Sequence, residues 1–143
     1  MLTLQRRVTV DRPIEQVFPY LADFSTTEEW EPGTVSCRRV SGDGGVGTTY
    51  QNVSKFLGRE TELTYVVEEF EDGRRIMLRG ENETVVSRDT MVLRPDGAGT
   101  EIHYTAEFEF SGLAKYAEPL LRLPLKKLGD DAVKGMRRAL ERV

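Results

Sequence analysis

The chain has 143 residues, of which 31% are charged and 38% hydrophobic, a composition typical of one soluble globular domain. No apolar run approaches the roughly 18 residues that cross a bilayer, and the N-terminus lacks the apolar core of a secretory signal. Cys37 is the only cysteine and cannot form an internal disulfide, so we expect residues 1–143 to form a single cytoplasmic domain.

Charge is unevenly distributed around a net value of −4. Residues 113–143 carry eight Lys or Arg and four Asp or Glu, whereas the rest of the chain is acidic. A basic segment can contact nucleic acid, a membrane or a regulatory partner, but it can also be the solvated face of a helix. An acidic body repels phosphate, and no nucleic-acid motif accompanies the basic end. We therefore expect no nucleic-acid partner and no stable membrane insertion.

The first third of the chain predicts one strand and two short helices. Alternating apolar residues favour a strand over Leu2–Val10. Pro13 suits the first turn of a helix, and apolar residues then recur at helical spacing from Ile14 to Leu21. A second, short helix has glutamates in its first turn, where the helix dipole favours them. It contains the only tryptophan, Trp30, near its end, before the helix-stopping pair Pro32-Gly33.

Residues 34–110 have the pattern of a meander of strands. Short turns rich in Gly, Asp and Asn separate the segments, and links of this length join antiparallel neighbours. Apolar and polar residues alternate most clearly in the last segment, so one face of the sheet should be wet and the other apolar. The predicted strands are Val35–Val40, Thr48–Phe56, Glu60–Phe70, Arg74–Arg79, Thr84–Leu93 and Thr100–Phe110.

A long amphipathic helix is predicted over residues 113–143, with a stripe that includes Leu113, Leu120 and Leu125. Pro119 and Pro124 should either begin the regular helix or kink it. A sheet with one apolar face needs a cover, and this helix has the length to supply it. The sequence thus predicts an α+β fold in which about seven antiparallel strands curve around the C-terminal helix, with two short helices after the first strand.

Several apparent motifs for catalysis or cofactor binding are ruled out by the residues around them. Gly42, Gly44 and Gly47 match a dinucleotide fingerprint by letter, but a strand follows them instead of a helix, so they predict a hairpin turn. His103 is the only histidine and alternates with apolar neighbours, so it should face solvent. A Ser-His-acid triad needs a histidine beside the nucleophile, which a solvent-facing His103 does not supply, and one His and one Cys cannot form a conventional zinc site. We expect no metal and no cofactor.

The order of these segments resembles a known family. The run VTVDRPIEQVFPYLADFSTTEEWEPGTVSCRRV (residues 8–40), the Gly45-Val-Gly-Thr motif and the segment Leu93–Thr100 are similar to the polyketide cyclase/dehydrase-like proteins of the START-related (SRPBCC) superfamily. The resemblance covers nearly the whole chain. It implies a helix-grip fold with a ligand tunnel between the sheet and the C-terminal helix.

Strand parity and this resemblance together select the side chains of a ligand site. Trp30 would pack at the rim or wall of the tunnel, although a purely structural plug is the equal alternative. Asp89 and Tyr65 are the only catalytic candidates, and Asp89 becomes a general-base candidate if it faces the pocket. The side chains expected to line the site are Trp30, Tyr50, Asn52, Tyr65, Met91, Tyr104, Leu121 and Leu128.

Two functions fit this inventory. The first is binding or carriage of a small hydrophobic or aromatic ligand, by a monomer or a homodimer. The alternative is an enzyme similar to polyketide cyclases, aromatases or dehydratases, acting without metal on a reactive ketide. The resemblance implies an arginine inside the pocket of cyclase members. Val67 stands at that position here, which weighs against cyclase chemistry.

Overall fold

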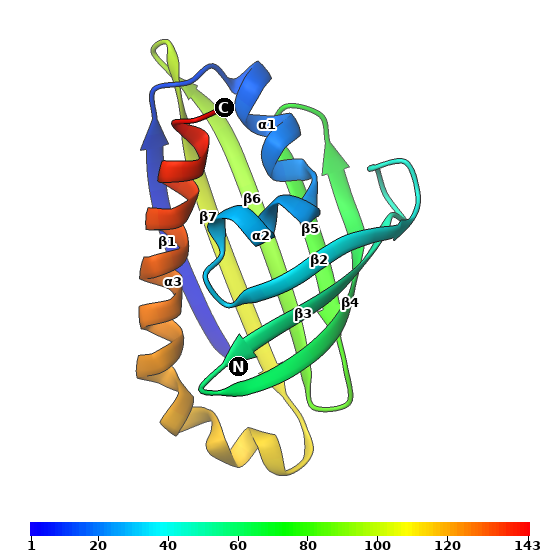
Figure 1. Ribbon diagram of the computed structural model, residues 1–143. Helices are drawn as coiled ribbons and strands as arrows, with labels where there is room; N and C mark the ends of the chain where they lie inside the picture. The colour runs from blue at the N-terminus through cyan, green and yellow to red at the C-terminus, as the bar shows by residue number, and fades with distance from the viewer.

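Seven antiparallel strands form one sheet that curves around the C-terminal helix (Figure 1). The computed structural model describes residues 1–143. The strand order is β1-β7-β6-β5-β4-β3-β2, so the first strand pairs with the last and every other pair is consecutive. The strands are β1 (Leu2–Val10), β2 (Thr34–Ser41), β3 (Thr49–Phe56), β4 (Arg59–Glu71), β5 (Arg75–Glu81), β6 (Val85–Asp96) and β7 (Gly99–Phe110).

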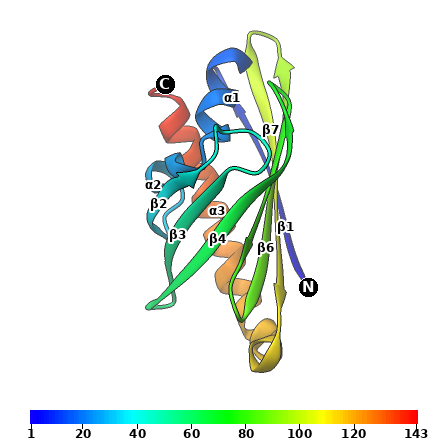
Figure 2. The ribbon, with the colours of Figure 1, turned by 90° about the vertical axis from the view of Figure 1, so that its right-hand side faces the viewer.

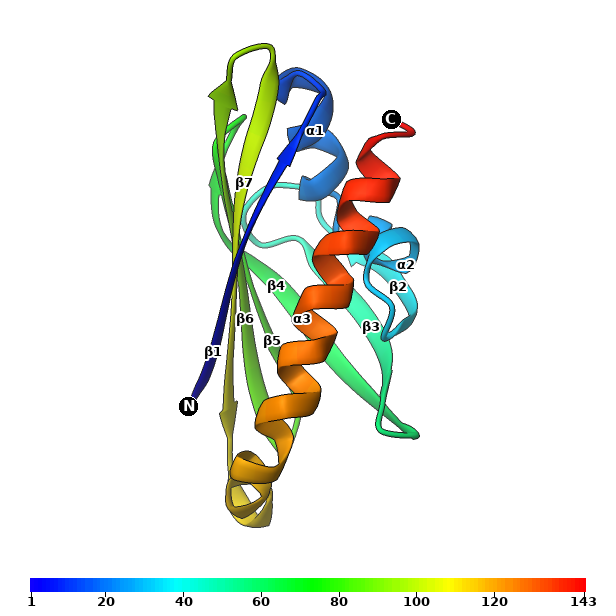
Figure 3. The same ribbon diagram turned by 90° about the vertical axis from the view of Figure 1, so that its left-hand side faces the viewer.

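The helices lie on the inner side of this sheet, as Figures 2 and 3 show from opposite sides. They are α1 (Ile14–Ala22), η1 (Phe24–Thr26), α2 (Thr27–Trp30), η2 (Gly112–Ala117) and α3 (Glu118–Leu140), where η marks a 3-10 helix. In Figure 3, α3 runs between β1 and β7 on one side and β2 and β3 on the other. The predicted fold class is therefore confirmed. No helix has the length and apolar character needed to cross a membrane.

The loop between β2 and β3 explains the glycine motif. Gly42, Gly44 and Gly47 have φ values of 96°, 107° and 91°, a region that side chains with a Cβ rarely adopt. They belong to the connection between two paired antiparallel strands, as the prediction of a hairpin turn required.

The C-terminal helix differs from its prediction at the start. Residues 112–117 form η2, and the regular helix begins at Glu118 because Pro119, which has no N–H, suits a first turn. Pro124 lies inside α3. Leu113 and Leu120 were expected in the buried stripe but are 87% and 80% exposed. Leu113 precedes the regular helix, and Leu120 lies on the side of α3 opposite Leu125, so neither shares its buried face.

The packing on the inner face is dense at one end of the sheet. Val17, Phe18 and Leu21 of α1 are buried, and Phe18 meets Phe70 of β4 edge-on with ring centroids 5.6 Å apart. Met136, near the end of α3, is fully buried in the same core. Buried side chains therefore fill this end of the sheet, where α1 lies at the top of Figure 1.

Helix α3 touches α2 directly, without an intervening side chain. A Cβ placed on Gly135 would overlap the carbonyl oxygen of Trp30 and would lie 3.1 Å from its carbonyl carbon. Only glycine permits this backbone approach. The contact holds Trp30 in place against the sheet.

We predict that Gly135→Ala lowers the free energy of unfolding by about 1–3 kcal/mol, because a backbone carbonyl cannot move aside for the added methyl group. Urea unfolding monitored by circular dichroism measures the change. The matched control is Gly129→Ala in the same helix, where the new Cβ meets the flexible end of Leu4 at 3.3 Å. The control should be neutral or more stable by up to about 1 kcal/mol, since alanine favours helix. Equal stability of the two variants would contradict the close contact.

Candidate ligand cavity

A cavity of about 370 Å³ lies between the sheet and the first two thirds of α3. This volume is within the range of small-molecule sites. Its wall is mainly apolar, and α3 contributes residues only as far as Ala132. Apolar lining residues from the sheet and helices include Leu4, Phe24, Leu63, Ala106, Phe108, Leu121, Leu125 and Leu128.

Six of the eight predicted ligand-site residues lie in the cavity wall. Trp30 comes from α2, Asn52 from β3, Tyr65 from β4, Tyr104 from β7, and Leu121 and Leu128 from α3. The catalytic candidate Asp89, from β6, also reaches the cavity. Their role in binding remains a prediction.

Tyr50 and Met91 do not line the cavity, so their predicted places in its wall are wrong. Both side chains are buried in the core instead. Phe24 packs against Tyr50 with ring centroids 5.9 Å apart, and Phe24 itself forms the wall. Met91 is fully buried on β6, the strand that α1 contacts.

Trp30 both fills space in the core and forms part of the cavity wall. Its side chain is 2% exposed and meets Tyr104 edge-on with ring centroids 6.0 Å apart. The indole N–H donates a hydrogen bond to the Thr26 hydroxyl at 3.3 Å. Because Trp30 also borders the cavity, the two alternatives left open by the sequence hold at once.

Buried polar groups in the cavity wall gather around Asp89, apart from Asn52, which accepts a hydrogen bond from the Ser54 hydroxyl at 2.6 Å. The Tyr104 hydroxyl donates to Asp89 Oδ2 at 2.8 Å, and the Ser87 hydroxyl donates to Oδ1 at 3.2 Å. The Tyr65 hydroxyl donates to Ser87 Oγ at 3.4 Å. Ser87 was missed by sequence reasoning, although it lies two residues before Asp89 and so shares its face of β6. Four side chains from three strands thus form one cluster around a single carboxylate.

Burial raises the pKa of Asp89 to about 6, from an ordinary value of 3.8. The hydrogen bonds from Tyr104 and Ser87 oppose this shift, and the charge of Glu31 adds to it. Burial and the nearby Asp89 charge raise the pKa values of Tyr65 and Tyr104 well above the ordinary 10.0. The tyrosines therefore stay protonated at neutral pH and act as donors, while Asp89 changes charge near it.

Tyr65 depends on a glycine in the neighbouring strand. A Cβ on Gly80 of β5 would stand 2.6 Å from the Tyr65 ring, so the ring lies flat over a strand position that has no side chain. On its other side the ring packs against Phe24, with centroids 4.8 Å apart. These contacts hold the Tyr65 hydroxyl toward Ser87.

A second acidic side chain, Glu31, borders the cavity just after α2. Its carboxylate accepts hydrogen bonds from the Thr34 hydroxyl at 2.7 Å and the Gly33 N–H at 3.0 Å. Burial nevertheless raises the pKa of Glu31. No cationic side chain offsets these acids inside the cavity, because its lining cations, Lys55 and Arg59, are exposed on the β3–β4 hairpin.

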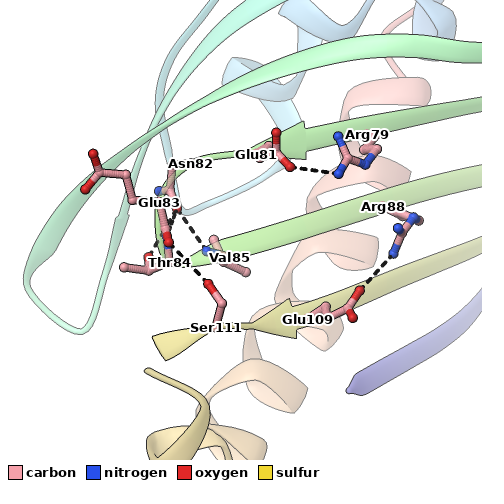
Figure 4. Close-up of polar contacts among 9 residues, drawn as sticks. All are labelled: Arg79, Glu81, Asn82, Glu83, Thr84, Val85, Arg88, Glu109 and Ser111. Carbon is pink, nitrogen blue, oxygen red and sulfur yellow. Dashed lines mark hydrogen bonds and ion pairs between the residues drawn. The ribbon is translucent and has the colours of Figure 1, made fainter. Parts of the chain in front are cut away.

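The β5–β6 turn fixes the outer rim of the cavity (Figure 4). Asn82 Oδ1 accepts hydrogen bonds from the N–H groups of Thr84 and Val85, at 2.9 and 3.0 Å, and both of these residues line the cavity. The Ser111 hydroxyl donates to the Glu83 carbonyl at 3.2 Å. This bond ties the start of η2 to the same turn.

Together these features define a helix-grip protein with a mainly apolar internal cavity and one buried carboxylate. No group of three or more His, Cys, Asp or Glu side chains is placed to hold a metal ion. The sequence matches the family described as "Polyketide cyclase / dehydrase and lipid transport" over residues 1–142. The chain belongs to this family. No curated protein matches the sequence.

Solved structures support the same fold. The protein TTHA0849 from Thermus thermophilus has a TM-score of 0.83 at 17% identity, covering 98% of this chain and 97% of that one. A START superfamily protein from Mycobacterium smegmatis has a TM-score of 0.82 at 12% identity, with 98% and 97% covered. The Zhui aromatase/cyclase from Streptomyces sp. R1128 has a TM-score of 0.81 at 16% identity, with 99% and 94% covered. At these identities the likeness establishes the fold alone.

The raised pKa of Asp89 predicts that this carboxyl destabilises the folded protein as pH rises from about 4 to about 6. The unfolded chain releases the proton at lower pH than the folded protein does, so stability is lost through the folded pKa, by about 3 kcal/mol. Asp89→Asn removes this titration. Its free energy of unfolding should therefore rise relative to that of wild type over the same interval, as measured by urea unfolding at several pH values. Parallel pH profiles for the two proteins would contradict the shift.

Proposed function

We propose that the protein binds and carries a small apolar or aromatic molecule, whose polar group meets Asp89 and Tyr104 at the inner end of the cavity. The observation that carries this proposal is a mainly apolar cavity in which hydrogen-bonded polar groups gather around Asp89. Such a site supplies affinity through apolar contact and orientation through a few hydrogen bonds. The family description, which includes lipid transport, supports the same class of ligand.

The charges of the site restrict the ligand further. Asp89 and Glu31 would repel an anionic group at the inner end, so a neutral hydroxyl or carbonyl fits better there. Protonated Asp89 donates a hydrogen bond and ionised Asp89 accepts one, and its pKa of about 6 makes both forms accessible. Any anionic group of the ligand would be best placed at the mouth, near Lys55 and Arg59.

The second candidate function is a cyclase- or dehydratase-like enzyme, and the geometry of Asp89 favours it. A carboxylate of raised pKa beside two tyrosine donors can take a proton from a carbon next to a carbonyl. Val67 weighs against cyclase chemistry, because it is apolar and 1% exposed at the position where the resemblance implies an arginine. No lining cation lies within the cavity to stabilise an enolate, so we favour carriage.

Filling the cavity should abolish binding without unfolding the protein. Ala106 lies in the wall and is 3% exposed, so Ala106→Leu would place three carbons in open space. We expect at least about tenfold weaker binding of 2-naphthol, followed by Trp30 fluorescence, at a melting temperature near that of wild type. The control is Ala139→Leu, also at 3% exposure but away from the cavity, which should cost about 1–3 kcal/mol of stability through overpacking. Unchanged affinity in Ala106→Leu would place the ligand elsewhere.

Carriage and catalysis differ in the effect of Asp89→Asn. We expect wild type to bind flat phenols with no turnover of poly-β-ketone mimics, and Asp89→Asn and Tyr104→Phe to weaken binding only. Loss of a catalytic base usually lowers the rate by a factor of about 10² to 10⁴. Measurable wild-type turnover that falls by such a factor in Asp89→Asn, with affinity unchanged, would establish the enzyme instead. Product analysis and fluorescence titration on the same samples separate the two outcomes.

A further inference from the structure

Exposed apolar side chains gather at the end of the molecule where the cavity opens. Leu113 and Tyr116 of η2 are 87% and 72% exposed, and Leu120 and Leu123 of α3 are 80% and 76% exposed. Leu57, in the β3–β4 turn, is 65% exposed and also lines the cavity. Single exposed apolar residues are ordinary, but a cluster of large ones marks an interaction surface. We call these five residues the apolar tip.

The two parts of the apolar tip stand on either side of the cavity mouth. The β3–β4 turn and η2 lie at the same end of the molecule, at the bottom of Figure 1, and Figure 3 shows them apart from each other at that end. Both segments contribute to the cavity wall, the turn through Leu57 and η2 through Ala114 and Ala117. A binding partner that contacts both parts of the apolar tip therefore covers the mouth of the cavity.

Leu57 is the least expected member of the tip. It is the only non-glycine residue with positive φ, at 53°, and it precedes Gly58 at 81° in a two-residue hairpin turn. Asn and Gly favour such positions, whereas leucine is strained there and exposes apolar surface. Both folding and solubility would favour asparagine at residue 57. An exposed leucine held in this conformation indicates a role in binding another molecule rather than in folding.

Cations outnumber carboxylates around the apolar tip although the protein as a whole is acidic. Residues 112–128 contain four cations and one carboxylate, Glu118, which pairs with the N-terminal amine at 3.1 Å. Lys127 is partly neutralised by Asp131 at 2.8 Å, whereas Lys115, Arg122 and Lys126 have no ion pair. Across the mouth, Lys55 and Arg59 flank Leu57, and the carboxylates nearby are Glu60, opposite Lys55 in the hairpin, and Glu83 in the β5–β6 turn. The tip is therefore apolar with a positive border, on a molecule of net charge −4.

We propose that the apolar tip docks reversibly on the surface of an anionic lipid bilayer. Leucine and tyrosine side chains that project beside cations suit the boundary between headgroups and acyl chains, where apolar burial and attraction to anionic lipid add together. The tip consists of two separated projections, not a groove, and a fluid bilayer can accommodate both. Docking would set the cavity mouth against the membrane, so that an apolar ligand passes between lipid and cavity without crossing water. The passage of ligand rests on the proposed function, whereas docking rests on the surface alone.

Vesicle flotation tests the docking directly. We expect the full-length protein to float with vesicles of phosphatidylcholine and phosphatidylserine at least about tenfold more strongly than with phosphatidylcholine alone, and to be released by salt. The double variant Leu120→Ser/Leu123→Ser should lose at least about tenfold in partitioning, because it removes two inserting side chains. The matched control is Val40→Ser/Val46→Ser, at 53% and 66% exposure outside the tip, which should float like wild type.

Leu57→Asn provides a test in which stability and docking move in opposite directions. Asparagine tolerates the positive φ of this turn, so we expect the melting temperature to rise by roughly 2–4 °C while partitioning to anionic vesicles falls several-fold. A variant that is better folded yet binds less cannot be explained by damage to the structure.

Three results would overturn the docking proposal. One is no flotation of wild type with either vesicle, and another is equal, salt-insensitive flotation with both. The third is a dimer in sedimentation velocity that Leu120→Ser/Leu123→Ser dissociates, which would assign the tip to a second copy of the chain. Titration with 2-naphthol, followed by Trp30 fluorescence without vesicles, tests the proposed ligand binding independently of docking. Failure of that titration with intact flotation would refute the ligand and leave docking in place.

Discussion

The contact between Gly135 and the carbonyl of Trp30 determines how α3 sits on the sheet. It brings two backbones together at one point, so the last third of α3 is held close and its side chains, such as Met136 and Leu140, are fully buried. The first two thirds of the helix have no such contact and border the cavity as far as Ala132. A larger residue at position 135 would lift the helix at its anchored end. The cavity therefore depends on a contact that lies outside it.

The second constraint is the cost of polar groups in an apolar interior. Asp89 would be strongly unfavourable if it were buried alone, and the hydroxyls of Tyr104 and Ser87 reduce that cost without supplying a counter-charge. No buried side-chain nitrogen or oxygen lacks a partner, so the cluster is satisfied even without a ligand. A ligand must replace or extend these hydrogen bonds, and that requirement gives a mainly apolar cavity its selectivity.

Sequence patterns predicted which face each strand turns inward, but not how deep the cavity extends. Alternation correctly turned Tyr65, Asp89 and Tyr104 toward the interior, and it also turned Tyr50 and Met91 inward. The last two are buried in the filled half of the core because Phe24 and α1 cover them, and no local pattern encodes where a distant helix packs. Ser87 escaped notice because a small hydroxyl residue in a strand carries no periodic signal.

The C-terminal helix also shows that a local sequence pattern does not fix which residues are buried. A spacing of three and four residues is continuous from Leu113 onward in the sequence, yet the 3-10 geometry of η2 and the start of α3 at Glu118 shift the phase of its first turns. The leucines that periodicity assigned to the core thereby became the exposed surface beside the mouth. Local helix type, which depends on hydrogen bonding to i+3 or i+4, accounts for Leu113, whereas Leu120 turns away from the buried face within the regular helix.

Because α3 packs densely at one end and covers the cavity at the other, local stability differs between the two ends of the helix. Toward Leu140 the helix cannot separate from the sheet without exposing the densely filled core, so opening there approaches global unfolding. Toward Pro119 the helix covers empty volume and breaks few apolar contacts when it moves. Local opening of the first turns of α3 should therefore cost less free energy than opening near Leu140. Under the proposed function, a bulky molecule would enter and leave through the Pro119 end, with the sheet as the rigid frame.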